Sequence, residues 1–116
     1  MGAWYTPLIA CVFHLLDFIS GFIGAVKEKN IKSSKMRDGL FKKFGYIACY
    51  ILAYLIDTYG CLIGLSVGVD VLPIIVLYAV STEIVSIIEN ICRINSDLLP
   101  DKLKKIFHIN STKEED

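Results

Sequence analysis

Residues 71–91 read VLPIIVLYAVSTEIVSIIENI, a long apolar stretch with an acid, Glu83, near its middle. A helix needs about 20 mostly apolar residues to cross the hydrocarbon core of a bilayer, and this stretch has that length. Within it, residues 74–80 are apolar all round apart from Tyr78. A helix on the surface of a soluble protein keeps a polar face, so the stretch favours a membrane span over a buried helix of a soluble bundle.

Residues 4–26 and 44–65 form two further stretches of this kind, and they contain Asp17 and Asp57 respectively. The chain is 54% hydrophobic with a mean hydropathy of +0.56, which is high for a small soluble domain. A carboxylate at the middle of a membrane costs about 2.5–3.5 kcal/mol even on lenient scales of helix insertion, so these acids are expected to face protein, water or a pore. The sequence predicts an all-α integral membrane protein with three transmembrane helices.

Basic residues avoid all three spans. Twelve Lys and Arg residues balance twelve Asp and Glu residues, but residues 1–26 and 44–92 contain no Lys or Arg. The basic residues expected at the inner leaflet are Lys27, Lys29, Lys32, Lys35, Arg37, Lys42, Lys43, Lys102, Lys104 and Lys105. Since loops rich in Lys and Arg stay in the cytoplasm, three spans place the N-terminus outside and the C-terminus inside. A basic cluster beside a membrane is typical of contact with anionic lipid at the cytoplasmic face, and no nucleic acid partner is expected.

The segments outside the spans also carry patterns. Residues 27–43 are predicted to form a cytoplasmic basic loop and an amphipathic helix that runs directly into the second span. Residues 92–109 are predicted to form an amphipathic tail. It either lies on the inner leaflet or packs on residues 34–43, and both alternatives stay open. Residues 110–116 are expected to form a disordered acidic end.

Polar side chains recur at helical spacing inside the first and third spans, so that each span has one polar stripe. A stripe of this kind can be hidden in helix contacts or exposed to a lumen. The residues expected to line a pore or to hydrogen-bond between helices are His14, Asp17, Asp57, Glu83, Ser86 and Glu89.

Glycines occur on the same faces as these polar residues. Gly60 and Gly64 form a G-x-x-x-G spacing that shares a face with Asp57, and small residues at this spacing let another helix approach closely. Close helix contacts are therefore expected at Gly21, Gly24, Gly60 and Gly64. Gly68 is interpreted as part of a flexible outer turn.

No motif supports an enzyme, because the chain contains no P-loop, H-E-x-x-H or C-x-x-C pattern. His14 and Asp17 have the spacing of two metal ligands on one helix, but a hydrogen-bonded pair between helices is the favoured interpretation. The four cysteines have no metal-type spacing and are expected to be free and buried. The sequence therefore predicts a protein that is not an enzyme and has no cofactor and no metal.

Six pieces of the chain, taken in order and spacing, resemble the toxin secretion/phage lysis holin family. The pieces are LDFISG (16–21), KSSK (32–35), DGLFKK (38–43), AYLID (53–57), EIVSIIEN (83–90) and LPDKLKK (99–105). The similarity extends over residues 8–109. One departure is that family members often have Asn-Glu where this chain has Thr82-Glu83.

The resemblance implies a homo-oligomer in the bacterial plasma membrane that opens a lesion. Through it a cell-wall hydrolase or a large toxin leaves the cytoplasm as cargo. Two other functions stay open from the residues alone: a small proton-coupled transporter, because membrane acids commonly carry protons, and an adaptor that recruits a cytoplasmic partner without permeabilising the membrane. The first stretch is also polar enough to lie in the interface, which would move the N-terminus inside.

Overall fold

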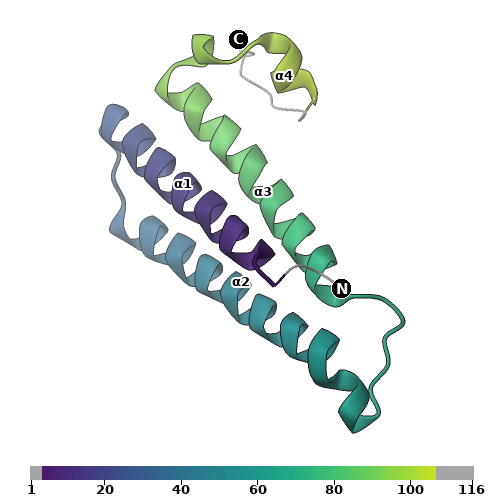
Figure 1. Ribbon diagram of the computed structural model, residues 1–116. Helices are drawn as coiled ribbons and strands as arrows, with labels where there is room; N and C mark the ends of the chain where they lie inside the picture. Colours follow the sequence, from purple (N-terminus) through teal and green to yellow (C-terminus); the bar gives the residue numbers. More distant parts are fainter. Residues whose placement is uncertain (1–3, 107–116) are drawn as a thin grey trace.

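The computed structural model describes residues 4–106, apart from the side chain of Lys104. Its main elements are the three long helices α1 (Thr6–Lys27), α2 (Ser33–Tyr59) and α3 (Val71–Ile94), which lie side by side along most of their length (Figure 1). Three short elements are η1 (Gly60–Ile63), η2 (Ser96–Leu98) and α4 (Asp101–Ile106). No strand occurs in the described part of the chain.

Three helical segments are long and apolar enough to cross a membrane, namely Thr6–Lys27, Ser33–Ile63 and Val71–Ile94. The predicted all-α fold with three transmembrane helices is confirmed. The helix α2 contains both residues 34–43 and the start of the second apolar stretch without a break. Residues 107–109 of the predicted tail and the predicted disordered end, 110–116, lie outside the described residues.

The helices α1 and α3 run parallel, and α2 runs antiparallel to both. The direction follows from the contacts: His14 of α1 meets Glu83 of α3, and Glu28, just after α1, meets Arg93 near the end of α3. Consequently, one end of the bundle contains the basic residues of the 28–32 connection together with the end of α3. We call it the basic end. The 64–70 connection lies at the other end, where α2 and η1 project beyond the start of α1 (Figure 1).

The core is small and lies where the three helices meet. Ala10 and Ala53 are fully buried there beside Tyr50 and Leu72, and alanines allow helix backbones to approach closely. Only 17–28% of the residues in each span are buried inside the chain. Large apolar side chains such as Leu77 are exposed instead, the reverse of the pattern in a soluble protein and the pattern expected of helices that face lipid.

The structure around Gly60 and Gly64 differs from the continuous helix that their spacing predicted. The helix α2 gives way to η1 at Gly60, and Gly64 ends η1 with φ +83°, a backbone conformation that favours glycine. A Cβ at Gly64 would meet no atom within 4 Å, and one at Gly60 would meet the carbonyl oxygen of Leu65 at 3.1 Å. Within one chain these two glycines therefore form a turn and make no close helix contact; a contact with a helix of another copy stays a prediction.

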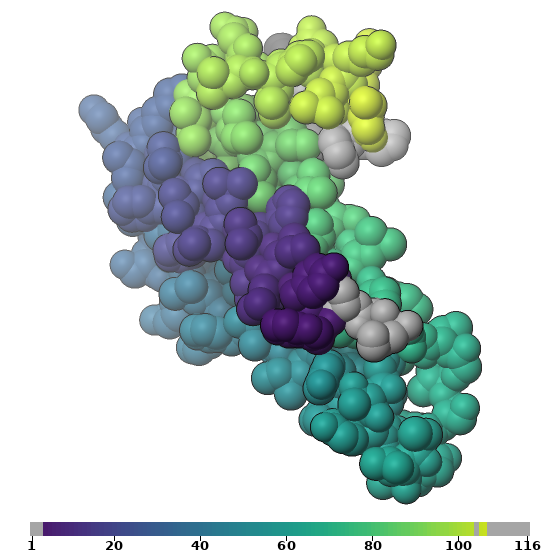
Figure 2. All heavy atoms as spheres, in the orientation of Figure 1, coloured from purple at the N-terminus to yellow at the C-terminus, as the bar shows by residue number. Residues whose placement is uncertain are grey.

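The four cysteines are free, as expected, but they are not buried. Cys49 and Cys61 are exposed, and Cys11 and Cys92 are half-buried. In the space-filling view the tail, drawn in yellow, covers the end of α3, while the tip formed by η1 and the following connection projects at the opposite end (Figure 2).

Candidate functional site: a polar cluster and a basic-end cavity

Five polar side chains from all three helices meet in the interior, and we call them the polar cluster. They are His14 and Asp17 of α1, Lys43 and Tyr50 of α2, and Glu83 of α3. His14 is 4% exposed and Glu83 is 2% exposed, so the least accessible charged side chain lies in the middle of the most apolar stretch.

Glu83 is held by two partners. Its Oε2 accepts a hydrogen bond from Lys43 Nζ at 3.2 Å and contacts His14 Nδ1. The other ring nitrogen, His14 Nε2, lies 2.7 Å from the Tyr50 hydroxyl. In a neutral imidazole, Nδ1–H then donates to Glu83 and Nε2 accepts from the Tyr50 O–H. The imidazole also stacks on the ring of Tyr46 with centroids 5.2 Å apart, which fixes its plane.

Lys43 is shared by two acids. Its Nζ donates to Asp17 Oδ2 at 2.8 Å as well as to Glu83, and its side chain is only 12% exposed. Two carboxylates facing one ammonium leave one negative charge. The expectation that Lys43 contacts the inner headgroups is therefore wrong, because the ammonium points into the bundle.

The contact between Lys43 and Asp17 agrees with their positions in the helical hairpin formed by α1 and α2. Asp17 lies ten residues before the end of α1 at Lys27, and Lys43 lies ten residues after the start of α2 at Ser33. Residues equally far from the connection of a helical hairpin lie at the same depth. No sequence signal distinguished Tyr50 as a partner of His14.

Asn90 extends the cluster toward the basic end. Its Nδ2 donates to Asp17 Oδ1 at 3.0 Å and to Ser20 Oγ at 3.0 Å. Two of the expected packing glycines lie beside this part of α3. A Cβ at Gly21 would meet Asn90 Nδ2 at 3.4 Å, and one at Gly24 would meet Arg93 Cζ at 3.3 Å. Both glycines therefore make room for polar side chains of α3.

Asp57 lies apart from the other acids. Its Oδ1 accepts from the backbone N–H of Val71 and its Oδ2 from that of Leu72, both at 2.7 Å. These are two of the first N–H groups of α3, which have no partner within the helix, and a carboxylate also interacts favourably with the helix dipole there. Asp57 thus connects the end of α2 to the start of α3, and both of these hydrogen bonds go to backbone groups and not to the polar cluster.

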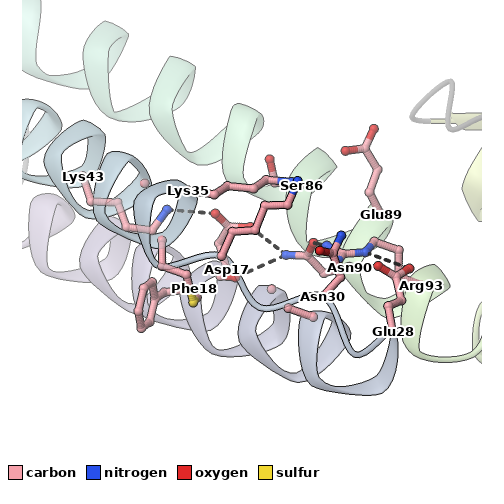
Figure 3. A pocket seen from close by; sticks show the side chains of 15 residues that line it. Asp17, Phe18, Glu28, Asn30, Lys35, Lys43, Ser86, Glu89, Asn90 and Arg93 are labelled. Carbon is pink, nitrogen blue, oxygen red and sulfur yellow. Dashed lines mark hydrogen bonds and ion pairs between the residues drawn. The ribbon is translucent and has the colours of Figure 1, made fainter.

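A cavity of about 510 Å³ opens between the helices from the polar cluster toward the basic end (Figure 3). Its lining comes from all three helices and the first connection: Asp17, Phe18, Gly21, Ala25, Glu28, Asn30, Lys32, Lys35, Met36, Gly39, Lys43, Ser86, Glu89, Asn90 and Arg93. Two of the predicted polar residues, Ser86 and Glu89, face this basic-end cavity from α3. Glu89 is exposed and Ser86 is half-buried.

An ion pair and two hydrogen bonds join the helix ends beside this cavity. Arg93 Nη2 lies 3.0 Å from Glu28 Oε1, and the pKa of Glu28 is lowered from its ordinary value of 4.5 by the hydrogen bond and the charge of Arg93. The charges of Lys35 and Lys27 lower it further. Lys27 also donates to the carbonyl oxygens of Arg93 and Ile94 at the end of α3, where a cation is favourable.

The described residues contain no group of three or more His, Cys, Asp or Glu side chains placed to hold a metal ion. His14 and Asp17, the pair with metal-type spacing, instead bind Glu83 and Lys43 respectively. The arrangement is one of charges and hydrogen bonds exchanged between helices.

Comparison with known proteins gives one family. The model of the bacteriophage holin family matches residues 1–111, which is nearly the whole chain. No curated protein and no solved structure matches the chain significantly.

Proposed function

Because the chain belongs to the bacteriophage holin family, we propose that it forms a homo-oligomer that opens a lesion in the bacterial plasma membrane. A cell-wall hydrolase or a large toxin leaves the cytoplasm through this lesion. The chain is a multi-pass membrane protein with three apolar helices. The observation that carries the proposal is the polar cluster: three apolar spans enclose charged groups that can serve either as helix contacts or as the lining of a lumen.

The described chain corresponds, in this proposal, to the closed protomer. Its outer surface is largely apolar, and Glu83 is buried with Lys43 and His14 as partners. Such a chain is tolerated by lipid, because the charged groups meet each other and not the acyl chains.

Opening of the lesion requires the side chains of the polar cluster to exchange their partners in the cluster for water. Lys43 holds α2 to both α1 and α3, so a movement of α2 separates the ammonium from at least one carboxylate. An unpaired charge in lipid costs several kcal/mol, and the separated state becomes stable only where several chains together enclose water. Self-association is therefore the condition for opening, and the change is a shift between two states of the same helices.

The orientation follows from the basic end. The 28–32 connection and the end of α3, with Lys27 and Arg93, lie at one end of the bundle, and we propose that this end faces the cytoplasm. Trp4 and Tyr5 then lie at the outer interface, where amphipathic aromatic rings are favourable.

A second candidate function is a proton leak. Hydrogen bonds and ion pairs join Tyr50, His14, Glu83, Lys43 and Asp17 in one line that reaches the basic-end cavity. A proton can move along such a line from the cavity. The opposite end is closed by the core around Ala53 and Leu72, so this path needs a conformational change to conduct.

The experiment that separates these functions is induced expression in a bacterium that also produces a large cytoplasmic protein without a signal peptide. Membrane potential and release into the medium are followed together, with an empty vector as control. Abrupt loss of potential with release is the expected result. Loss of potential without release would support the proton leak. No change in either, with the protein shown to be in the membrane, would contradict both functions and favour the adaptor.

A further inference from the structure

The rim of the basic-end cavity carries cations that the polar cluster does not use. The cavity lining contains four cationic residues and three acidic ones, but Lys43 also pairs with Glu83 behind the lining, so the excess of positive charge lies at the rim and not in the interior. Arg93 and Lys43 are already engaged with Glu28 and with the polar cluster. Lys32 and Lys35 are exposed and stand at the rim, where the first connection enters α2.

The lowered pKa of Glu28 shows which charged side chains lie around it. Arg93 has the largest effect on its lowered pKa, but Lys35 and Lys27 act on it in the same direction. Three basic side chains therefore lie near Glu28 at the mouth of the cavity, where they also favour the binding of another anion of suitable size.

The cavity also has the size and the walls of a binding site. A volume of about 510 Å³ lies within the usual range of about 300–1,000 Å³ for small-molecule pockets. Phe18 and Met36 supply apolar wall beside the lysines. Its mouth lies at the helix ends, the level at which a bilayer presents phosphate groups to basic residues.

We propose that the basic-end cavity binds the phosphate group of an anionic phospholipid, one lipid per chain. Lys32 and Lys35 contact the phosphate, and Phe18 and Met36 contact the glycerol and the first methylene groups of the acyl chains. This site goes beyond the proposed lesion and does not rest on it, because lipid binding is measured on the closed chain.

The test is a titration of the full-length chain in detergent, followed by native mass spectrometry. The probes are phosphatidylglycerol, phosphatidylcholine and inorganic phosphate. We expect one retained phosphatidylglycerol per chain, in preference to phosphatidylcholine. The double variant Lys32→Gln/Lys35→Gln should weaken phosphatidylglycerol binding by about tenfold or more, since each lysine near an anionic lipid contributes about 1 kcal/mol.

A matched control removes the same charge from the same helix. Arg37 and Lys42 are exposed on α2 and do not line the cavity, so Arg37→Gln/Lys42→Gln should change the affinity less than about twofold. All four side chains are on the surface, and circular dichroism verifies that both variants keep their helix content.

Three outcomes would overturn the proposal. Equal weakening by the two double variants would mean diffuse attraction by surface charge. Equal retention of phosphatidylcholine and phosphatidylglycerol would mean that the anionic phosphate is not recognised. Retention of inorganic phosphate that the Lys32→Gln/Lys35→Gln variant abolishes, without retention of lipid, would assign the site to free phosphate.

Discussion

Asp57 and Glu83 occupy comparable apolar stretches, yet the chain stabilises them in different ways. Asp57 accepts from two backbone N–H groups at the start of α3, and those donors are fixed by the helix. Glu83 accepts from the side chains of Lys43 and His14, which belong to two other helices. Partners of the first kind stay in place as long as α3 is folded. Partners of the second kind can be exchanged for water when the helices move, so the polar cluster is the part of the molecule suited to switching.

The largest expected effect comes from removing the shared cation of the polar cluster. Lys43→Met leaves Asp17 and Glu83 without their common partner, and breaking a buried ion pair typically costs about 3–5 kcal/mol. The free energy of unfolding in mixed detergent micelles should fall by about this amount. Loss of membrane potential in cells should also begin earlier, because the closed protomer is the state that loses stability.

Lys42→Met is the matched control for this variant, because Lys42 is the exposed neighbour of Lys43 on the same helix. It removes the same charge and should leave both measurements nearly unchanged. Equal effects of the two substitutions would contradict the assignment of Lys43 to the interior. Adding Glu83→Gln to Lys43→Met should restore part of the lost stability, since it removes one unpaired carboxylate.

The difference between the acids also shows what could be predicted from the sequence. Three spans, their acids and the basic segments follow from composition and spacing, because hydrophobic length and helical periodicity are local properties. Asp57 was grouped with Glu83 because periodicity gives the face of a helix but not the depth of each residue in the bundle. Lys43 was placed in the headgroups because its partners lie 26 and 40 residues away in sequence.

Gly64 illustrates a second limit. The G-x-x-x-G spacing reports that small residues share a face only if the helix continues, and α2 changes to η1 at Gly60. The point at which α2 changes to η1 lies inside an apolar stretch, so neither composition nor helical periodicity marks it.

The second-largest expected loss of stability comes from replacing Asp57. Asp57→Ala removes the acceptor for Val71 N–H and Leu72 N–H, and loss of a side chain that caps a helix start costs about 0.5–2 kcal/mol. Asp57→Asn should recover only part of this, because its single amide oxygen can accept from one of the two backbone N–H groups. The measurement is the same detergent titration, with Asp38→Ala, an exposed acid of the same helix, as control. A loss in Asp57→Asn as large as in Asp57→Ala would show that the charge matters more than the cap.

A smaller effect is expected at the edge of the polar cluster. Tyr50→Phe keeps the ring and removes only the hydroxyl that lies 2.7 Å from His14 Nε2. A hydrogen bond of this type contributes about 0.5–1.5 kcal/mol, so unfolding should become easier by about that amount. Tyr54→Phe is the control, because Tyr54 is exposed on the same helix. A change no larger than that of the control would exclude a stabilising bond between Tyr50 and His14.

The smallest expected effect concerns the exposed ion pair between Glu28 and Arg93 at the basic end. The pKa of Glu28 is lowered by Arg93, so the carboxylate contributes stability at pH values above its unfolded pKa. That contribution is lost as the pH falls through the lowered pKa of the folded chain. Glu28→Gln should therefore be slightly less stable than the unmodified chain at about pH 6, and this difference should be smaller at about pH 3.

Thermal unfolding in detergent at the two pH values measures this difference. Glu89→Gln is the control, because Glu89 is an exposed acid at the same cavity. A difference that persists unchanged at low pH would mean that Glu28 acts through packing and not through its charge. A pH-dependent difference as large as the effect of Lys43→Met would mean that the helix ends, and not the polar cluster, hold the closed protomer together.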